Sequence, residues 1–355
     1  MVTIRDVANK AGVSIATVSN VINHNCKVSE DTSHKVWNAI HELNYIPDYI
    51  SRGAKSIMSK SIGVLIEDIQ HPYTQPSLFI HGISNCCEEK NYRMQLINMN
   101  IGASRNNDIT SVDLRVEKKL AASIRSLEKN SLRGVIYIAI HPRNMDFMLK
   151  QINLPLPIVM AYSFSDGVPS FISDDFQGGR IATEYLIQNG HTKIGLLSGP
   201  TNSFPAHKRF MAYQEVLMEH GLPFNPAYFY AGNWFYEDGI KACQYFCSLP
   251  DPPTAIFAMN DIMAYGILNY AHEANIRIPD DLSVIGFDNL EMSSYTYPPL
   301  TTVKLPFYEI GYQSAASLIQ TLDNHGEQQG TKPLIQPIAC KIINRQTVKD
   351  ISAPS

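Results

Sequence analysis

The sequence lacks the features that define membrane, secreted or metal-binding proteins. None of its apolar runs approaches the roughly 20 residues that a membrane-spanning helix needs. Its beginning, MVTIRDVANKAGVS, has no basic segment followed by an apolar stretch, so no secretory signal is expected. Its six cysteines form no CxxC pair and follow no metal-ligand spacing, which is typical of reduced thiols. We therefore expect a cytoplasmic protein with no metal site and no membrane partner.

Charged residues are scarce, at 17% of the 355 residues, whereas a typical globular protein has about 25%. The hydrophobic fraction of 45% is ordinary for a folded protein, and the length suggests two or three folding units. The net charge of −4 does not by itself point to nucleic acid. Its distribution is uneven, however, because residues 1–60 hold seven Lys/Arg and five Asp/Glu. Residues 1–60 therefore carry a mild excess of positive charge, which is the sign that a nucleic-acid partner would require.

The familiar catalytic motifs are also missing. The chain contains no GxGxxG, Walker loop, GxSxG or HExxH sequence. Possible acid–base residues are Asp174–Asp175, Glu67–Asp68 and His191, but side chains adjacent in sequence usually point in different directions. The sequence thus predicts no catalytic residue and no cofactor. A sugar-processing enzyme on an α/β core stays open as the less favoured alternative, while a transport receptor would need an export signal.

Three regions differ in their pattern. Residues 1–45 are short, helical segments, and the polar residues 46–60 contain one proline, one glycine and three serines, typical of a linker or hinge. From residue 61 onward, apolar runs alternate with segments of helix length; the runs are 62–66, 94–98, 134–138, 157–161, 193–197, 254–258 and 283–286. Buried strands that alternate with helices are typical of parallel sheets covered on both faces. We predict an all-α headpiece and an α/β core of two doubly wound lobes.

The lobes are expected to be discontinuous within the core of residues 61–345. We assign about 61–162 and 293–322 to the N-lobe, and about 163–292 and 323–345 to the C-lobe. Residues 346–355 form a tail, and the polar stretch 100–117 is expected to be a loop. The segment after Asn344 has no heptad pattern, so no tetramer-forming coiled coil is expected.

The first region has the pattern of three capped helices. Thr3 and Ser14 are expected to cap the first two, with Gly12 as the left-handed stop between them. Ser29 is expected to cap the third helix. Buried stripes are predicted for each helix; they are Ile4, Val7, Ala8 and Ala11, then Val18, Val21 and Ile22, then Val36, Ile40 and Leu43. Ala16, Asn20 and Asn23 then point away from the core, and Ile15 lies at the exposed start of the second helix.

Two short helices joined by a glycine-containing turn and backed by a third form a helix-turn-helix unit. Such a unit places the start of its second helix against base edges in the major groove of DNA. The hydroxyls and backbone amides at Thr3, Ser14 and Thr17 would suit phosphate oxygens. The alternative is a small three-helix packing module without a DNA-binding role.

The stretch TIRDVANKAGVSIATVSNVINHNCKVSEDTSHKVWNAIHELNYIP resembles the headpiece of the lactose/galactose/purine repressor family. The resemblance extends to about Val348 and includes the later segments NDIMAYG and PPLTTVK. It implies a DNA-binding headpiece, a hinge and a two-lobed core similar to periplasmic sugar-binding proteins. By position, Ile15, Ala16 and Asn20 match the variable base-reading residues of the family. Asn23 and Lys27 match its further DNA contacts.

The hinge departs from the family pattern. Pro47 and Asp48 suit a first helical turn, whereas Gly53 costs about 1 kcal/mol of helix propensity, so this segment could become ordered only on DNA. A plain tether is the alternative. In the family a hinge leucine enters a minor-groove step, but here that position is Ala54, followed by Lys55. Alanine is too small to wedge a base step, so either operator kinking is absent or Ile57 or Met58 takes over this role.

Ligands in two-lobed α/β proteins bind where the strands end, so residues directly after strands are the candidates. Carboxylate, amide and guanidinium groups can each engage neighbouring hydroxyls, and aromatic rings can cover the apolar face of a sugar. The candidates are His71, Tyr73, Arg209, Trp234, Asn260, Asp288 and Phe307. Each also has a structural alternative: Arg209 could pair with Asp288, Asn260 could cap a helix, and Trp234 could belong to the core.

The resemblance sharpens this set. Within the family the arrangement is most like the pocket of the lactose repressor, with Arg209, Asn260 and Asp288 at hydroxyl-binding positions. Trp234 and Phe307 match its ring-stacking residues. Tyr162 replaces an aspartate found in many sugar-responsive members, and His71 and Tyr73 replace a more usual Asn-Pro-Phe. A sugar or glycoside is therefore the expected effector, with a sugar phosphate or a nucleoside or purine as the alternative.

These features together predict a transcriptional regulator, expected to be a repressor. One headpiece reads only half of a site, so a homodimer on a near-palindromic, double-stranded operator is expected. Effector binding and DNA binding must then influence each other reciprocally. Whether the effector releases or recruits DNA is left open by the sequence.

Overall fold

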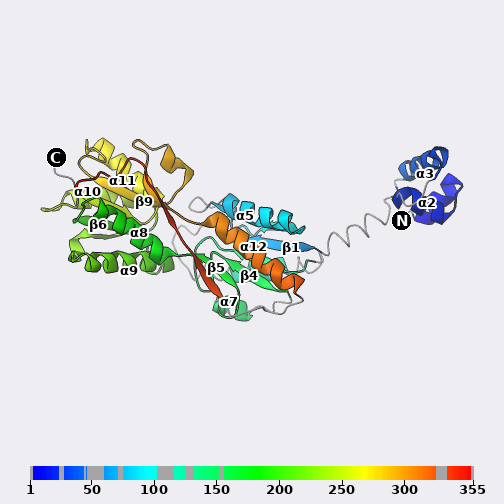
Figure 1. Ribbon diagram of the computed structural model, residues 1–355, viewed down its shortest axis with the longest axis horizontal. Helices are drawn as coiled ribbons and strands as arrows, with labels where there is room; N and C mark the ends of the chain where they lie inside the picture. Colours follow the sequence, from blue (N-terminus) through cyan, green and yellow to red (C-terminus); the bar gives the residue numbers. More distant parts are fainter. Residues whose placement is uncertain are drawn as a thin grey trace.

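The computed structural model describes residues 3–23, 28–43, 45, 60–70, 75–101, 116–124, 132–151, 156–324 and 334–352. These residues form a three-helix headpiece and a core of two six-stranded sheets (Figure 1). Both predicted parts of the fold are thus confirmed. The predicted hinge lies almost wholly outside the described residues, as do Lys27, Ala54, Lys55, His71 and Tyr73.

The headpiece consists of α1 (Ile4–Ala11), α2 (Ile15–Asn23) and α3 (Glu30–Glu42). One valine from each helix is fully buried where the helices meet, namely Val7, Val18 and Val36. Tyr45, just beyond α3, belongs to the same small core. The three stripes predicted from helical periodicity are therefore the faces that the helices bury.

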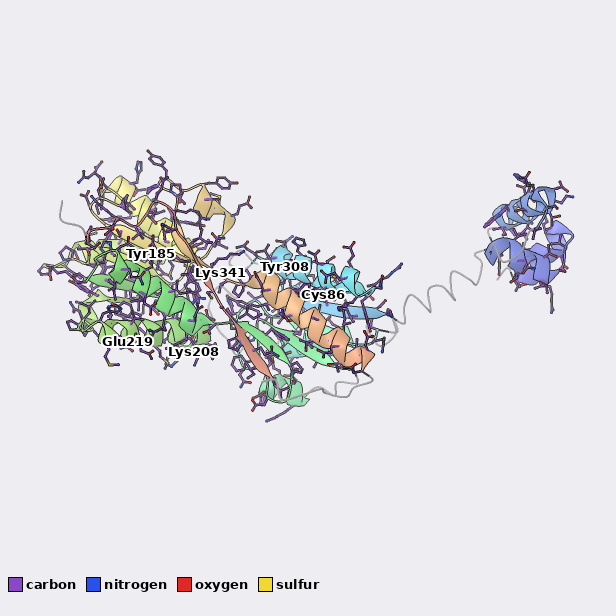
Figure 2. The ribbon with its side chains drawn as sticks, in the orientation of Figure 1. Cys86, Tyr185, Lys208, Glu219, Tyr308 and Lys341 are labelled. Carbon is purple, nitrogen blue, oxygen red and sulfur yellow. The ribbon has the colours of Figure 1, made fainter. Side chains whose placement is uncertain are left out.

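The N-lobe sheet has the order β11-β5-β4-β3-β1-β2, and all of its strands are parallel. The strands are β1 (Ser61–Ile66), β2 (Arg93–Asn98), β3 (Val135–Ile138), β4 (Ile158–Ala161), β5 (Ser170–Ser173) and β11 (Ile335–Ile338). Two long helices, α5 (Pro76–Glu89) and α12 (Phe307–Asp323), pack against each other on one side of this sheet (Figure 1). Figure 2 shows Cys86 of α5 and Tyr308 of α12 on these adjoining helices. The short helix α7 (Asp146–Gln151) follows β3.

The C-lobe sheet has the order β12-β10-β9-β8-β6-β7. The strands are β6 (Ile194–Ser198), β7 (Phe229–Ala231), β8 (Ala255–Ala258), β9 (Ser283–Asp288), β10 (Thr301–Lys304) and β12 (Lys341–Ile343). Its helices pack as two pairs, α8 (Asp175–Gln188) with α9 (Phe204–Glu219) and α10 (Tyr236–Cys247) with α11 (Asp261–Glu273). The 3-10 turns η1 (Pro226–Tyr228) and η2 (Glu291–Ser294) precede β7 and β10. The edge strand β12 is antiparallel to β10, so this sheet is not wholly parallel as predicted.

The chain crosses between the lobes three times, and the crossings correct the predicted lobe boundaries. β5 pairs within the N-lobe sheet, although the C-lobe was expected from residue 163. β10 pairs within the C-lobe sheet, although residues from 293 were assigned to the N-lobe. β11 returns to the N-lobe before the chain enters β12, whose first residue Lys341 is labelled in Figure 2. The physical reason is that a short strand joins whichever sheet offers it an unpaired edge.

Two further predictions are corrected at the ends of segments. Val116 and residue 117 are helical, and Val116 is fully buried, so the expected loop 100–117 is shorter than predicted; residues 102–115 lie outside the description. Beyond the predicted core, Thr347 is fully buried, and its backbone oxygen accepts a 2.8 Å hydrogen bond from the Val284 amide. The C-lobe therefore includes part of the predicted tail.

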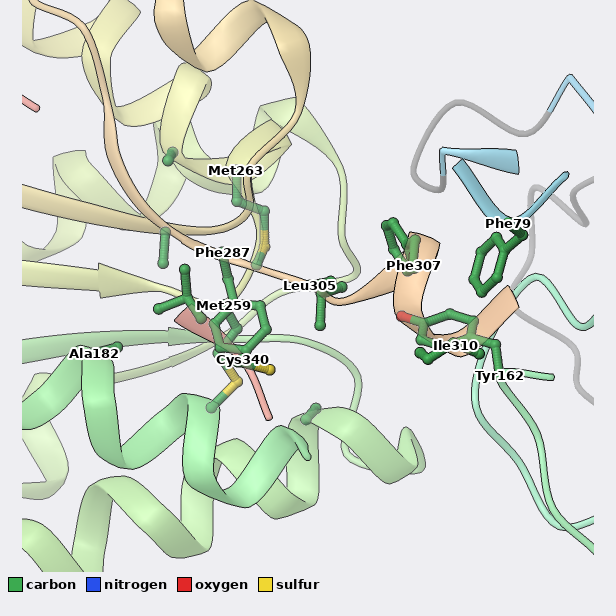
Figure 3. Packing of buried hydrophobic residues seen from close by; sticks show 14 of the residues in the cluster. Phe79, Tyr162, Ala182, Met259, Met263, Phe287, Leu305, Phe307, Ile310 and Cys340 are labelled. Atoms are coloured by element: carbon green, nitrogen blue, oxygen red, sulfur yellow. The ribbon is translucent and has the colours of Figure 1, made fainter. Parts of the chain in front are cut away.

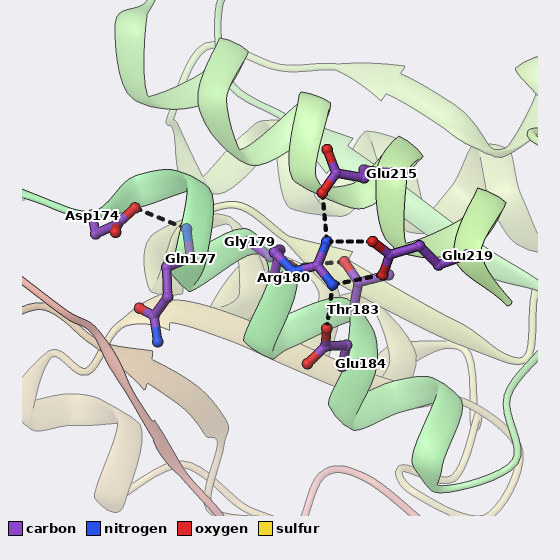
Figure 4. A network of polar contacts seen from close by, with 8 residues as sticks. All are labelled: Asp174, Gln177, Gly179, Arg180, Thr183, Glu184, Glu215 and Glu219. Carbon is purple, nitrogen blue, oxygen red and sulfur yellow. Dashed lines mark hydrogen bonds and ion pairs between the residues drawn. The ribbon is translucent and has the colours of Figure 1, made fainter.

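A polar network joins α8 to α9 on the surface of the C-lobe (Figure 4). Arg180 donates to Glu184 on its own helix at 2.9 Å and to Glu215 and Glu219 on α9, each at 2.6 Å. The Arg180 guanidinium thus forms ion pairs with three carboxylates. Since exposed ion pairs contribute about 0–1 kcal/mol each, the network orients the two helices more than it stabilises the fold.

Candidate functional sites

The headpiece presents α2 through a tightly specified turn. The Thr3 amide and hydroxyl each donate to the Asp6 carboxylate at 2.7 Å, which fixes the start of α1. Gly12 ends α1 with φ of 68°, a backbone conformation that glycine adopts without strain. Ser14 Oγ accepts a 3.1 Å hydrogen bond from the Thr17 amide and so caps α2. The turn and the cap thus set the direction in which α2 leaves α1.

The outward face of α2 is available to a partner. Ser14, Ile15 and Ala16 are exposed, and the Ile15 side chain is 42% exposed despite being apolar. Thr17 and Asn20 are half-buried on the flank, and Asn23 ends the helix. The hydroxyls of Ser14 and Thr17 are 2.9 Å apart and bond to each other, so the phosphate contacts expected of them would have to share or replace this bond.

The second candidate site lies where the strands of both sheets end. Because all strands but β12 run parallel, the residues that follow them gather at one edge of each sheet. Residues from these edges make contacts between the lobes. Gln75 Nε2 donates to the Asn289 oxygen at 3.0 Å, and the rings of Phe164 and Phe204 lie 5.0 Å apart.

At the centre of this region Arg209 is held by a buried ion pair. Its Nε and Nη2 donate to Asp175 Oδ1 at 2.9 and 2.6 Å, and its Nη1 donates to the Met259 oxygen. Both partners of the ion pair are about 97% buried or more. The guanidinium also lies over the Phe287 ring at 3.6 Å. Arg209 therefore pairs with Asp175 at the junction of β5 and α8, and not with Asp288 as considered from the sequence.

Three of the predicted effector residues have strained backbones. Tyr162, Trp234 and Asp288 have φ values of 60°, 73° and 111°, in the region that favours glycine. Apart from asparagines, they are the only non-glycine residues with positive φ in the part of the chain that the structure describes. Strained backbone of this kind costs about 1–3 kcal/mol per residue and clusters at functional sites. Positive φ thus occurs at three of the eight positions that the sequence singled out for the effector.

Asp288 is the polar side chain of this set that is left unused. It is 6% exposed, and within the described residues its carboxylate accepts none of the hydrogen bonds found. Burial raises the pKa of Asp288 well above its usual value; Arg209 lowers it, and Asp261 and Asp175 raise it again. Asp288 is thus a buried carboxyl group that makes no side-chain hydrogen bond among the described residues and holds its proton more tightly than an ordinary aspartate.

Trp234 and Asn260 are fixed by each other and by their neighbours. Asn260 Oδ1 caps α11 by accepting from the Met263 amide at 2.8 Å, and its Nδ2 donates to the Trp234 oxygen at 3.1 Å. The structural alternative considered for Asn260 is thus realised. The Trp234 ring lies on the backbone of Gly199, where a Cβ would come within 2.1 Å of it. Only a glycine at 199 lets the indole take this position, 5.8 Å from Arg209.

Aromatic rings form the N-lobe side of the region (Figure 3). Tyr162 meets Phe307 edge to face at 5.2 Å, and Phe79 lies 4.8 Å from Phe307 and 5.6 Å from Tyr162. All three are at least 96% buried, and burial raises the pKa of Tyr162. Figure 3 shows Phe287, Met259 and Cys340 on the C-lobe side, with Leu305 between the two groups.

The sequence pointed to Asp175 and Glu67 only as possible acid–base residues, and it did not identify Asp175 as the partner of Arg209, the contact of Phe287, or a buried network after β1. Glu67 is fully buried and accepts hydrogen bonds from Tyr137, Arg143 and the Ile140 amide. Asp175 follows a strand that has no long apolar run, and nothing in the sequence around Glu67 indicates a partner 76 residues away.

The acid–base candidates of an enzyme are not brought together. Asp174 caps α8 through the Gln177 amide, whereas Asp175 faces Arg209. Glu67 is occupied in its own network, and His191 bonds Thr254 and the Lys349 oxygen elsewhere in the C-lobe. Among the described residues there is no group of three His, Cys, Asp or Glu side chains that could hold a metal ion. No helix in the described ranges is long and apolar enough to cross a membrane.

Comparison with known proteins agrees with this architecture. Residues 3–48 match the family described as bacterial regulatory proteins, lacI family, and residues 183–348 match a periplasmic binding protein-like domain. The HTH-type transcriptional repressor PurR of Aliivibrio salmonicida is 32% identical over 332 residues, which cover 93% of this chain and 95% of that protein. PurR of Photobacterium profundum is 30% identical and covers 99% of this chain and 100% of its own.

Solved structures give the same result. The lac repressor dimer bound to operator and the anti-inducer ONPF has a TM-score of 0.72 at 27% identity, covering 98% of this chain and 99% of that one. The lac repressor bound to ONPG in the repressed state has a TM-score of 0.72 at 28% identity, with the same coverage. A helix-turn-helix headpiece on a two-sheet core of this kind defines a DNA-binding transcriptional regulator. The chain belongs to the lacI family of bacterial regulatory proteins.

Proposed function

We propose that this chain is a cytoplasmic, homodimeric repressor whose operator affinity is set by a small uncharged sugar or glycoside bound between the lobes. The observation that carries the proposal is the strained trio Tyr162, Trp234 and Asp288 around Arg209. Strain is retained where the surrounding structure needs a side chain in one position. Here the strained positions present one carboxyl group that has no side-chain hydrogen bond among the described residues, close to aromatic rings, which suits the hydroxyls and the apolar face of a sugar ring.

The charge of the region argues against a sugar phosphate. The buried ionisable groups are Arg209, Asp175, Asp288 and Asp261, so carboxylates outnumber the single guanidinium. Three donor nitrogens of Arg209 are already used, and Arg143 is paired with Glu67. Arg345, whose charge acts on Asp261, already donates to the Leu300 oxygen and to Asn289 Oδ1, so a phosphate brought to this place would have to compete for donors that are in use. A neutral ligand that donates hydrogen bonds avoids this cost.

A purine or nucleoside is the second candidate, and the PurR relatives favour it. Its N–H groups could donate to Asp288, and its flat ring could lie against Phe307 or Trp234. The two candidates differ in the number of donors that they offer to one carboxylate. Affinity measurements can therefore separate them.

On the DNA side, we propose that Ile15, Ala16 and Asn20 read base edges, with Thr3, Ser14, Thr17 and Asn23 near the backbone. The exposure of Ile15 supports this, because an apolar side chain held in water at a helix start gains from contact with a thymine methyl. Lys27, Ala54 and Lys55 complete the proposal on the resemblance alone. Since one headpiece reads half of a symmetric operator, a homodimer would place two headpieces on the two half-sites.

The test is calorimetry with the full chain against a panel of monosaccharides, glycosides, sugar phosphates, purine bases and nucleosides, followed by gel-shift assays with operator-like DNA. We expect an uncharged sugar or glycoside to bind and to change the DNA affinity. Asp288→Ala should remove this response and leave DNA binding intact. Asp280→Ala, which removes an exposed carboxylate paired with Lys349, is the matched control. If only purines or nucleosides bind, the effector is the second candidate and the sugar is ruled out.

If no member of the panel alters DNA binding, the regulator has no effector of this kind. If Asp288→Ala abolishes DNA binding as strongly as effector binding, Asp288 has a structural role.

A further inference from the structure

A polar contact between the lobes lies beside the predicted effector residues. Gln75 directly precedes α5 of the N-lobe, and its Nε2 donates to the Asn289 oxygen of the C-lobe at 3.0 Å. A backbone oxygen can only accept, so the nitrogen of the Gln75 amide group is the atom that has to face it. Asn289 follows Asp288, the last residue of β9. One hydrogen bond thus joins the two lobes at the residue next to Asp288.

The other hydrogen bonds found for Asn289 among the described residues lie within the C-lobe. Arg345 Nη2 donates to Asn289 Oδ1 at 2.7 Å, and the Asn289 amide donates to Thr302 Oγ1 at 3.3 Å. Asn289 has a φ of 53°, a left-handed conformation that asparagine tolerates better than most residues. Arg345 is itself fixed, because its Nη1 donates to the Leu300 oxygen at 2.7 Å. The C-lobe therefore holds the Asn289 carbonyl group in one orientation.

The side chain of Gln75 has no capping role in its own helix. Gln75 is the N-cap residue of α5, but its side chain makes no capping hydrogen bond. Pro76 follows in the first turn, where its fixed φ favours the start of a helix. Replacement of the Gln75 side chain should therefore remove the contact with the C-lobe without removing a helix cap.

We propose that Gln75 is a positioning residue for the effector site, because its side-chain amide fastens the start of α5 to the backbone beside Asp288. We call Gln75, Asn289 and Arg345 the interlobe clasp. The clasp holds the N-lobe at a fixed separation from Asp288, so a bound effector leaves more slowly. This role towards the effector rests on the proposed function, whereas the role of the clasp in holding the lobes together does not.

The clasp is sensitive to small movements of the lobes. A hydrogen bond is lost once its donor and acceptor are more than about 3.5 Å apart, so a shift of about 1 Å at this place breaks the clasp. A second contact between the lobes, made by the rings of Phe164 and Phe204, is apolar and depends less on direction. The net contribution of one hydrogen bond changes an equilibrium constant by about two- to tenfold. The clasp should therefore raise the population of the present lobe arrangement by about this factor.

The first measurement needs no effector and uses double electron–electron resonance on the full chain. One nitroxide label is attached to Cys247, which is exposed on α10 of the C-lobe, and the other to Phe147→Cys, at an exposed position of α7 in the N-lobe. Cys26→Ser removes the cysteine that lies outside the described residues, and the remaining cysteines are buried. An excess of unlabelled chain suppresses distances between copies. The measurement then gives the distribution of distances between the two lobes.

We expect a narrow distribution with native Gln75 and a broader one in Gln75→Ala. Gln75→Glu has a side chain of the same size that cannot donate at neutral pH, so it should broaden the distribution at least as much. Gln320→Ala, which removes an exposed glutamine side chain from α12 of the same lobe, is the matched control and should change nothing. An unchanged distribution in both Gln75 variants overturns the proposal. A change in Gln75→Glu alone also overturns it, because repulsion by the new carboxylate would then be the cause.

The second measurement uses the monosaccharides, glycosides, purine bases and nucleosides of the panel. For each compound that binds the native chain in calorimetry, stopped-flow tryptophan fluorescence gives the dissociation rate. Gln75→Ala should release the compound about two- to tenfold faster, and Gln320→Ala should release it at the native rate. Equal rates in the native chain and Gln75→Ala overturn the positioning role. If no compound binds the native chain, the proposed effector is wrong, and the distance measurement alone decides whether the clasp holds the lobes.

Discussion

The two sides of the candidate effector site contain different kinds of side chain. The C-lobe side consists of buried charges, with Arg209 locked to Asp175 and Asp288 left without a partner among the described residues. The N-lobe side consists of rings, with Tyr162 and Phe307 packed edge to face and Phe79 tilted against both. The charged N-lobe side chains of Glu67 and Arg143 form an ion pair with each other. The buried charged groups of the candidate site are thus concentrated in the C-lobe.

This difference suggests that the two sides would contribute differently to ligand specificity and to ligand affinity. Hydrogen bonds to fixed charges distinguish ligands by single hydroxyl groups, because an unpaired buried group is costly. Aromatic faces add affinity with little discrimination, because every ring-shaped ligand has an apolar face. We therefore expect substitutions on the C-lobe side to change specificity and those on the N-lobe side to change affinity evenly.

The largest effect is expected from breaking the ion pair on the C-lobe side. Arg209→Ala leaves the Asp175 carboxylate buried without its cation, so we expect a loss of about 3–5 kcal/mol in the free energy of unfolding. Urea denaturation followed by circular dichroism measures it. Arg277→Ala is the control, since Arg277 is 71% exposed and its pair with Asp281 should contribute at most about 1 kcal/mol. Equal losses in the two variants would contradict the assignment of a buried pair.

A pH effect should come next and should arise from the C-lobe. Burial raises the pKa of Asp261 to about 6 from an ordinary 3.8, although Ser293, Thr302 and the Leu290 amide hydrogen-bond to it. The folded state therefore holds this proton more tightly than the unfolded state does. Its stabilising contribution is complete below pH 3.8 and is lost as the pH rises through 6, by about 3 kcal/mol at most.

Asp261→Asn tests this contribution. The free energy of unfolding of the native chain should fall relative to that of the variant between pH 4 and pH 7, because the amide side chain of the variant cannot titrate. Parallel pH profiles for the two proteins would show that Asp261 is ionised in the folded state at the lower pH as well.

The contrast between the two sides predicts two patterns of effector binding. Asp288→Asn should weaken the effector about 30-fold, or about 2 kcal/mol, and should weaken analogues that lack the bonded hydroxyl far less. Phe307→Leu, on the other side, should weaken the effector and its analogues by similar factors. Calorimetric titration of both variants with the same set of analogues checks this. Equal discrimination by both variants would remove the distinction between the sides.

The smallest effect is expected at Tyr162. Its hydroxyl makes none of the hydrogen bonds found among the described residues, so Tyr162→Phe should change the free energy of unfolding by about 0.5 kcal/mol or less. Effector affinity should change by less than about threefold if the ring alone matters. A tenfold loss would mean that the N-lobe also reads a polar group of the effector.

Periodicity predicted the headpiece and the long buried strands well, because Val7, Val18 and Val36 or β1 and β8 carry their signal within a few residues. It missed β5, β11 and β12, whose apolar content is low and whose pairing depends on residues far away in the chain. The same reason explains the site. Trp234 and Asp288 could be proposed as effector residues because they lie at or just after the ends of β7 and β9, and Arg209 because its helix α9 follows β6. Asp175 was not recognised as the partner of Arg209, because it follows β5.

The last crossing between the lobes has a consequence for synthesis of the protein. Ser170 in β5 pairs with Ile335 in β11, and Thr302 in β10 pairs with Ile343 in β12, so each sheet receives its last strand from one short segment. While the ribosome is still making the C-lobe, β5 exposes an unpaired edge, which is open to pairing with other chains. Both lobes are therefore completed almost simultaneously, after release of this segment, and an early stop codon before residue 335 would leave two open sheets instead of one finished lobe.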